Sequence, residues 1–281
     1  MDITDFLFGI EKFGLASLKS LDIYENKEEA KAEPDPDPLK EFDISNFTCE
    51  KDFECPVCEN KFKSRVMRSG VMRPVATDYD LSPVYSEPIH PIFYDILICP
   101  NCGHAAIYQT FLRVNSVQVK LVLEQIKPNF HYVEYPALLD ADMALERFKL
   151  ALANAIVKQV KDSEKAYICM KIAWLYRSKK DNKNEAAFIE YAYKGYQIAL
   201  ENEYFPLLGM EQNTVKFVIA AYANKLGHYA DAMKIVSQLV TATNISVRLK
   251  DKALDLKHEI ERAKAEKENS SKEPEQHKKK R

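Results

Sequence analysis

The chain has little glycine and no long apolar run. Seven glycines among 281 residues disfavour an all-β fold with many tight turns, whereas long helices need few glycines. No stretch of roughly 18 or more apolar residues occurs, so we predict no transmembrane helix. The apolar fraction of 46% is ordinary for a globular protein and is enough for a hydrophobic core without disulfide bonds.

The chain also lacks a strong net charge and the features of a secretion signal. Its formal net charge of −2 creates no overall field that favours nucleic acids or anionic membranes. The N-terminal residues include no basic region followed by a small-residue cleavage site. Six cysteines, four of them in two C-x-x-C pairs, fit a reducing compartment better than a disulfide framework. We therefore expect a cytoplasmic protein.

The two C-x-x-C pairs are typical of a metal site. Cys55 and Cys58 flank Pro-Val, and Cys99 and Cys102 flank Pro-Asn. Each pair places two thiolates on a tight turn, and two such turns supply the tetrahedral sulfur ligands that Zn²⁺ prefers. Gly103 follows the second pair, where such a turn often needs a positive φ. We predict that these four cysteines bind one structural Zn²⁺ ion.

Other uses of these cysteines remain open at the level of sequence. Iron in a rubredoxin-like cage has the same ligands, and a single C-x-x-C pair can be a redox-active dithiol, although no βαβ pattern surrounds either pair. Four thiolates leave no open position for water, so we expect a structural metal. We expect His104 beside the ligands or at the surface, Cys49 as a small packed or partly exposed residue, and Cys169 in the core of a helix.

The remaining polar residues form no recognisable catalytic pattern. His90 lies among Glu87, Pro88 and Pro91, which favours a loop. The sequence has no Ser/His/Asp order, no phosphate-binding glycine loop and no H-E-x-x-H helix. We therefore predict that the protein is not an enzyme.

Changes in composition divide the chain into five predicted segments. Apolar residues at helical spacing mark the first, and acids alternating with prolines mark the second. In the third, strand-like runs at residues 51–54, 66–75 and 93–98 surround the cysteine pairs. The segments are an amphipathic arm (1–21), an acidic, proline-containing linker (22–43), a zinc-ribbon-like module (44–112), a helical domain (113–266) and a disordered tail (267–281).

The helical domain contains a match to a tetratricopeptide repeat at residues 213–244. Ala220 is small where two helices approach, Gly227 lies in the turn between them, and Ala232 packs against the first helix. Residues 163–203 resemble a degenerate copy with a longer turn, and a capping helix is expected near 246–266. The predicted fold class is therefore α+β and mostly α: a small zinc-ribbon-like β module followed by an antiparallel, tetratricopeptide-like array of helical hairpins.

Several of these motifs together resemble one bacterial family. They are CPVC, then FYDILICPNCGHAA after a long insert, then AWLYR within a helical array. This pattern resembles the family called domain of unknown function 2225, with the cysteines matching at positions 55, 58, 99 and 102. The resemblance implies the architecture and a cytoplasmic location, and it implies no established activity.

Three functional hypotheses follow. The first is a scaffold or adaptor that binds a protein or peptide partner through the concave face of its helical array. The second is a nucleic-acid-binding protein that uses the basic residues of the zinc module, although acids follow in the same module. The third is a thiol redox sensor. The basic residues are Lys61, Lys63, Arg65, Arg68 and Arg73.

Overall fold

The computed structural model describes residue 14, residues 43–86 and residues 89–276, with side chains up to residue 266. The predicted amphipathic arm (1–21) and acidic linker (22–43) lie almost entirely outside these residues. Predictions about the arm and the linker are therefore not tested by the structure.

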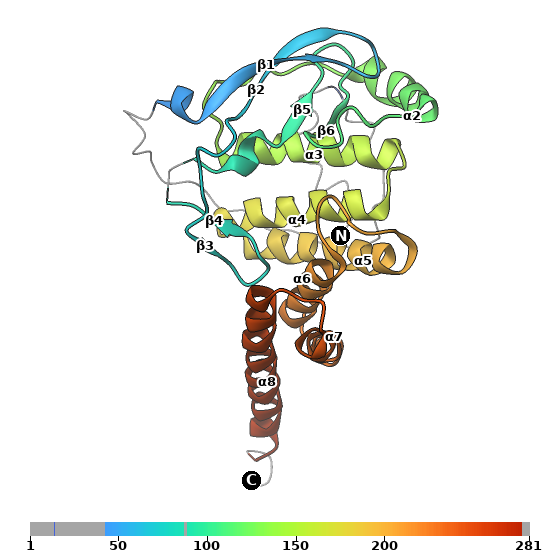
Figure 1. Cartoon of the computed structure of the whole chain (residues 1–281). Helices are drawn as coiled ribbons and strands as arrows, with labels where there is room; N and C mark the ends of the chain where they lie inside the picture. Colours follow the sequence, from blue (N-terminus) through green and yellow to red (C-terminus); the bar gives the residue numbers. More distant parts are fainter. Residues whose placement is uncertain (1–13, 15–42, 87–88, 277–281) are drawn as a thin grey trace.

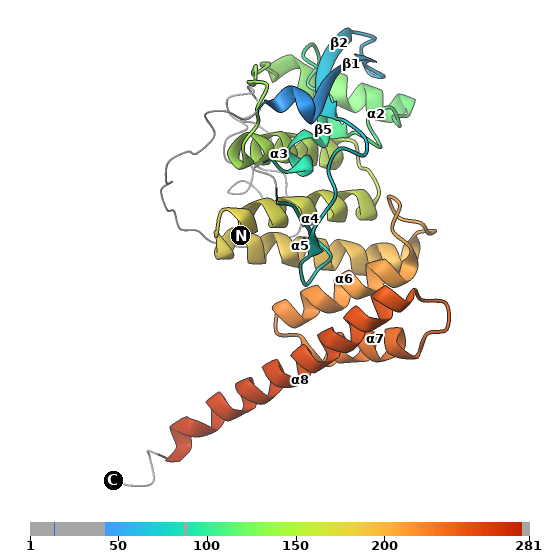
Figure 2. The same cartoon turned by 60° about the vertical axis from the view of Figure 1, so that its left-hand side comes forward.

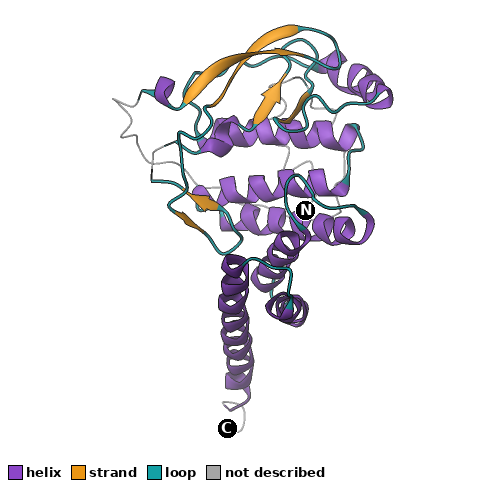
Figure 3. Cartoon of the chain, viewed as in Figure 1, coloured by secondary structure: helices purple, strands orange, loops and turns teal. Residues whose placement is uncertain are grey.

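Strands β1, β2, β5 and β6 lie at one end of the molecule, and the short β3–β4 pair lies beside helices α4 and α5 (Figures 1 and 3). Helices form most of the rest, as expected for a mostly helical α+β protein. The strands form three antiparallel pairs, β1–β2, β3–β4 and β5–β6. They are β1 (Thr48–Glu54), β2 (Lys61–Met67), β3 (Ala76–Thr77), β4 (Pro83–Val84), β5 (Ile96–Ile98) and β6 (Ala105–Ile107). The α-helices are α2 (Ser116–Leu121), α3 (Ala141–Val157), α4 (Asp162–Ser178), α5 (Asn182–Asn202), α6 (Gln212–Lys225), α7 (Tyr229–Thr241) and α8 (Val247–Gln276).

Each C-x-x-C pair lies in the turn of a β-hairpin. Strands β1 and β2 pair from Thr48 opposite Met67 to Glu54 opposite Lys61, and β5 and β6 enclose the second cysteine pair. The strand predicted at residues 66–75 is wrong for most of its length, because β2 begins at Lys61 and ends at Met67. Pairing across the cysteine turn sets the position of β2, and this pairing outweighs the β propensity of the residues that follow.

Three helices end in the same way. Gln159 after α3, Lys180 after α4 and Gly227 after α6 all have positive φ, at 51°, 59° and 79°. At each end the positive-φ residue donates its N–H to the carbonyl three residues back, and the next residue donates to the carbonyl five residues back. Only residues 179–181 separate α4 from α5, so the longer turn expected there is wrong. Lysine adopts the left-handed conformation that sequence reasoning assigns to glycine.

Helix α3 lies between the two cysteine hairpins, β1–β2 and β5–β6, and helices α4 and α5 (Figure 1), and it contacts β5, β6 and α4. Its buried residues, such as Phe148, belong to one continuous apolar cluster. This cluster runs from Cys55 in the first hairpin to Ile260 in α8. No gap in the hydrophobic core of the described residues therefore separates the cysteine hairpins from the helices.

The last helix extends away from the body (Figure 2), with Ala253, Leu256 and Ile260 buried on its inner side. It continues to Gln276, ten residues beyond the predicted end at residue 266. Lysine and glutamate, which have high helix propensity, are frequent in this extension. None of the described helices is long and apolar enough to cross a membrane.

Candidate functional site

The structure brings the four predicted cysteines together. The Sγ atoms of Cys55 and Cys102 lie 3.6 Å apart, as do those of Cys58 and Cys99, and all four lie within 4.8 Å of one another. A tetrahedron with Zn–S distances of about 2.3 Å has sulfur atoms about 3.8 Å apart, so the spacing fits one ion. A disulfide requires about 2.05 Å, and all six cysteines are free.

Both hairpins present their cysteines through the same backbone geometry. In the first turn, Glu59 N–H donates to Cys55 O; in the second, Gly103 N–H donates to Cys99 O. The residue after each pair has positive φ, 58° for Glu59 and 72° for Gly103. Glu59 is exposed, so its side chain extends into solvent without a clash. At Gly103 the turn packs against Phe130, which leaves no room for a Cβ atom.

Two hydrogen-bond donors near the sulfur atoms favour thiolates, whereas the crowding of the four sulfur atoms opposes their ionisation. Val57 N–H donates to Cys55 Sγ at 3.4 Å, and the Asn101 side chain donates to Cys58 Sγ at 3.4 Å. The neighbouring thiols of Cys55 and Cys99, and then burial, raise the pKa of Cys102 well above its usual range. Four ionised thiolates at this spacing are stable only around a bound cation, so the donor set fits a soft metal ion.

A buried lysine lies near this cluster. Burial lowers the pKa of Lys158 to about 8, and the charges of Glu164 and Cys55 oppose that shift. A divalent metal with four thiolates has a net charge of −2, which a nearby ammonium group partly compensates. An ammonium group at Lys158 would thus offset part of the negative charge of four thiolates around a divalent ion.

His104 is not at the surface and is not among the four clustered ligands. Its ring is fully buried against Phe111, and its Nε2–H donates to Phe111 O at 3.0 Å. Burial, together with the charge of Lys158, lowers the pKa of His104 to about 4, so the ring is neutral at pH 7. The backbone carbonyl of His104 accepts from Cys99 N–H, which anchors the second cysteine turn.

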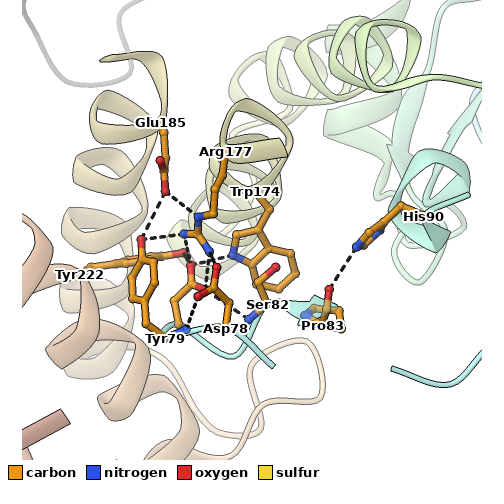
Figure 4. A network of polar contacts seen from close by, with 10 residues as sticks. Asp78, Tyr79, Ser82, Pro83, His90, Trp174, Arg177, Glu185 and Tyr222 are labelled. Carbon is orange, nitrogen blue, oxygen red and sulfur yellow. Dashed lines mark hydrogen bonds and ion pairs between the residues drawn. The ribbon is translucent and has the colours of Figure 1, made fainter. Parts of the chain in front are cut away.

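The other residues singled out from the sequence lie apart from the sulfur cluster. Cys49 is a partly buried residue in β1, and Cys169 is buried in α4, as expected. His90 caps a short 3₁₀ turn through Ile92 N–H, and its Nε2–H donates to Pro83 O (Figure 4). His90 thus connects loops, in agreement with the prediction.

Replacing Gly103 with alanine is expected to lower the free energy of unfolding by about 2–3 kcal/mol. A Cβ there would lie 2.5 Å from Phe130 Cγ and 3.0 Å from Ile126 Cγ2. Gly70 is the matched control, because its φ is similar at +76° but a Cβ there meets nothing within 4 Å. Gly70→Ala should cost only about 1 kcal/mol of backbone strain. Urea unfolding of both variants measures the difference; equal losses would contradict the tight packing of Gly103.

A second cluster of polar side chains was not predicted from the sequence (Figure 4). It forms where the turn between β3 and β4, residues 78–82, contacts helices α4, α5 and α6. We call these residues the acidic turn. Its Asp80 is fully buried and accepts hydrogen bonds from Trp174 Nε1 at 2.8 Å and Tyr222 OH at 3.2 Å.

Arg177 of α4 is at the centre of this cluster. Its guanidinium forms ion pairs with Asp78, Asp80 and Glu185, at 2.8, 2.8 and 2.6 Å. It also lies 4.4 Å from the ring centre of Tyr79. Burial alone would lower the pKa of Arg177. The hydrogen bonds that Arg177 donates to Asp80, and the negative charge of Asp80, outweigh burial and raise this pKa.

One signal in the sequence pointed to part of this cluster. Trp174 and Arg177 are three residues apart and therefore lie on one face of a helix. An arginine beside a tryptophan on a packed helix requires an anionic partner. The partner, Asp80, is 97 residues away in sequence, and nothing local identifies it.

Comparison with known proteins places the chain in a family without an assigned role. No curated protein matches it, and no solved structure does. The profile of domain of unknown function 2225, described as an uncharacterized protein conserved in bacteria, matches residues 48–260. The match includes all four clustered cysteines and both partners of the Asp80–Arg177 ion pair. Because it covers most of the chain, the protein belongs to the bacterial family known as domain of unknown function 2225.

Proposed function

We propose that the protein is a cytoplasmic scaffold that binds a peptide segment of a partner protein on the face formed by α4, α5 and α6. We also propose that Cys55, Cys58, Cys99 and Cys102 bind one Zn²⁺ ion whose role is structural. Supporting the zinc assignment are the all-thiol donor set and the spacing of the sulfur atoms. In this account, the ion joins the seven-residue strands of the β1–β2 hairpin to the three-residue strands of the β5–β6 hairpin.

The proposed repeat architecture is tetratricopeptide-like. In support of it, a three-residue turn that contains one positive-φ residue follows both α4 and α6 and leads into an antiparallel partner helix. The contacts of α4 with α5, α5 with α6 and α6 with α7 are those of hairpins stacked in sequence order. Arrays of this kind bind extended segments of other proteins.

The observation that carries the proposal is the acidic turn itself. Side chains from α4, α5 and α6 surround Asp78, Tyr79 and Asp80, which come from a distant part of the chain. Lys225 of α6 adds a second cation 5.5 Å from the Tyr79 ring. We infer that this face recognises short segments with an aromatic residue between two acids, and that the acidic turn occupies it until a partner segment displaces it.

A peptide of residues 76–84 tests this proposal. The protein is prepared in its natural form and with residues 78–82 replaced by glycine and serine. We expect the peptide to bind the variant in which residues 78–82 are replaced, with a Kd in the micromolar range, measured by fluorescence anisotropy. The natural protein should bind the peptide at least ten times more weakly. The control peptide carries Asp80→Asn and should bind the replaced protein much more weakly.

Two outcomes would contradict the proposal. In one, the replaced protein has a natural circular dichroism spectrum and does not bind the peptide. In the other, neither this protein nor a second variant, Asp78→Ala with Asp80→Ala, folds, which would make the acidic turn an integral part of the fold.

The two rival functions gain no specific support from the contacts. Arg68 donates its Nε–H to the carbonyls of Ser45 and Thr48, and Arg65 contacts Thr48 and Glu50. These two arginines therefore stabilise the hairpin. Nucleic-acid binding and redox sensing stay predictions, and retention on RNA at low salt or reversible thiol oxidation would test them.

A further inference from the structure

A cavity of about 250 Å³ lies where β2 and β5 meet α3 and the chain before it. Three cationic side chains line it, Lys63, Arg65 and Arg147, against two carboxylates, Glu50 and Glu134. Glu50 already forms an ion pair with Arg65 at 3.5 Å. The cavity therefore has an excess of positive charge. None of the described residues that line it belongs to the sulfur cluster or to the acidic turn.

Arg147 is the unusual member of this group. Only 7% of its surface is exposed, and its Nε–H is buried without a hydrogen-bond partner. Its guanidinium donates to Ile96 O through Nη2, and no carboxylate among the described residues forms an ion pair with it. The adjacent Glu146 accepts from Tyr135 OH instead. A buried cation without an anion is strongly unfavourable, so its retention here requires a reason.

We propose that this cavity binds the oxyanion group of a small molecule, with Arg147 as the principal contact. A guanidinium offers a planar fork of donors that matches both phosphate and carboxylate. The ring of Tyr132, which is half exposed, supplies a flat surface for a planar part of the ligand next to the oxyanion. The Tyr135 ring lies 5.7 Å from the Arg147 guanidinium and helps to hold it in place. The volume suits one oxyanion group on a small body, and a dinucleotide is too large.

A binding role and a purely structural role of Arg147 predict different effects of replacing it. If Arg147 only stabilised β5 through Ile96 O, replacing it with methionine of similar length would destabilise the protein. If the charge instead serves to bind an anion, Arg147→Met removes a buried charge that no carboxylate of the described residues neutralises. The variant should then be at least as stable as the natural protein in the absence of ligand, and it should lose the response to anions.

The experiment uses the full chain with its metal and two probes of matched shape, phenyl phosphate and benzoate. Thermal unfolding is recorded at constant ionic strength with chloride as the reference, and ³¹P line broadening of phenyl phosphate gives a direct measure of binding. We expect a saturable rise in Tm with at least one probe. A response to phenyl phosphate alone assigns a phosphorylated ligand, and a response to benzoate assigns a carboxylate.

Three variants decide whether Arg147 is responsible. Arg147→Met should weaken the apparent affinity at least ten-fold, and Arg147→Lys, which keeps the charge but loses the fork, should weaken it less. Arg113→Met, an exposed arginine outside the cavity, should behave like the natural protein. The proposal is overturned if neither probe exceeds chloride. It is also overturned if the lysine variant, or a folded methionine variant, responds like the natural protein.

Discussion

Replacing Asp80 with alanine is expected to lower the free energy of unfolding by about 3 kcal/mol. The carboxylate is fully buried and accepts from four groups: the Ser82 amide, the Trp174 indole, the Arg177 guanidinium and the Tyr222 hydroxyl. Its removal leaves an indole N–H and a hydroxyl without this acceptor inside the protein. The loss stays below that of an isolated buried pair, because Arg177 keeps Asp78 and Glu185.

Two measurements check this prediction. Urea unfolding gives the free energy, and the emission of Trp174, which is the single tryptophan of the chain, reports the site directly. We expect its emission to shift to longer wavelength in Asp80→Ala. Asp80→Asn should lose less, since the amide keeps the shape and one acceptor oxygen. Asp255→Asn, on the exposed face of α8, is the matched control and should change stability by less than about 0.5 kcal/mol. A loss below about 1 kcal/mol in Asp80→Ala would contradict the assigned contacts.

Replacing Cys99 with serine is expected to lower the free energy of unfolding by about 5 kcal/mol and to abolish metal retention. Cys99 is fully buried, and in the proposed centre its thiolate is one of four that join the two hairpins. Because the hairpins share one core with α3 and the helices beyond, loosening them should destabilise the whole chain. Apparent Zn²⁺ binding energies of about 10–16 kcal/mol in small domains leave room for a loss of this size.

Cys49→Ser provides the control for this experiment. Cys49 lies in β1 outside the sulfur cluster, so its replacement should retain the metal and change stability far less. Urea unfolding and metal content of both variants are measured side by side. Similar behaviour of the two variants would contradict a structural role for the metal.

The sequence was sufficient for features whose signals are local. Two C-x-x-C pairs indicate a metal site by their residue types and spacing alone, and in the structure their sulfur atoms lie close enough together to bind one ion. The helices of residues 141–266 follow from apolar periodicity, and Gly227 marks the turn after α6. Each of these features depends on residues a few positions apart.

Features that depend on distant contacts were missed or misplaced. The position of β2 is set by pairing with β1 across the cysteine turn. Lys180 and Gln159 adopt positive φ because the packed helices on both sides require a tight turn, and their residue types do not signal it. Asp80 and Arg147 are informative only once their surroundings are known. Four groups donate hydrogen bonds to the buried Asp80 carboxylate, whereas the buried Arg147 forms no ion pair with an acid of the described residues.

The most direct test of the proposed zinc centre is the metal content of the purified natural protein, measured together with the reactivity of its thiols. We predict one Zn²⁺ ion per chain by inductively coupled plasma mass spectrometry. We further predict four cysteines that react with a thiol reagent only after a chelator is added. Protein that is folded but holds no near-stoichiometric zinc, or whose four clustered cysteines react freely without chelator, would contradict the proposed centre.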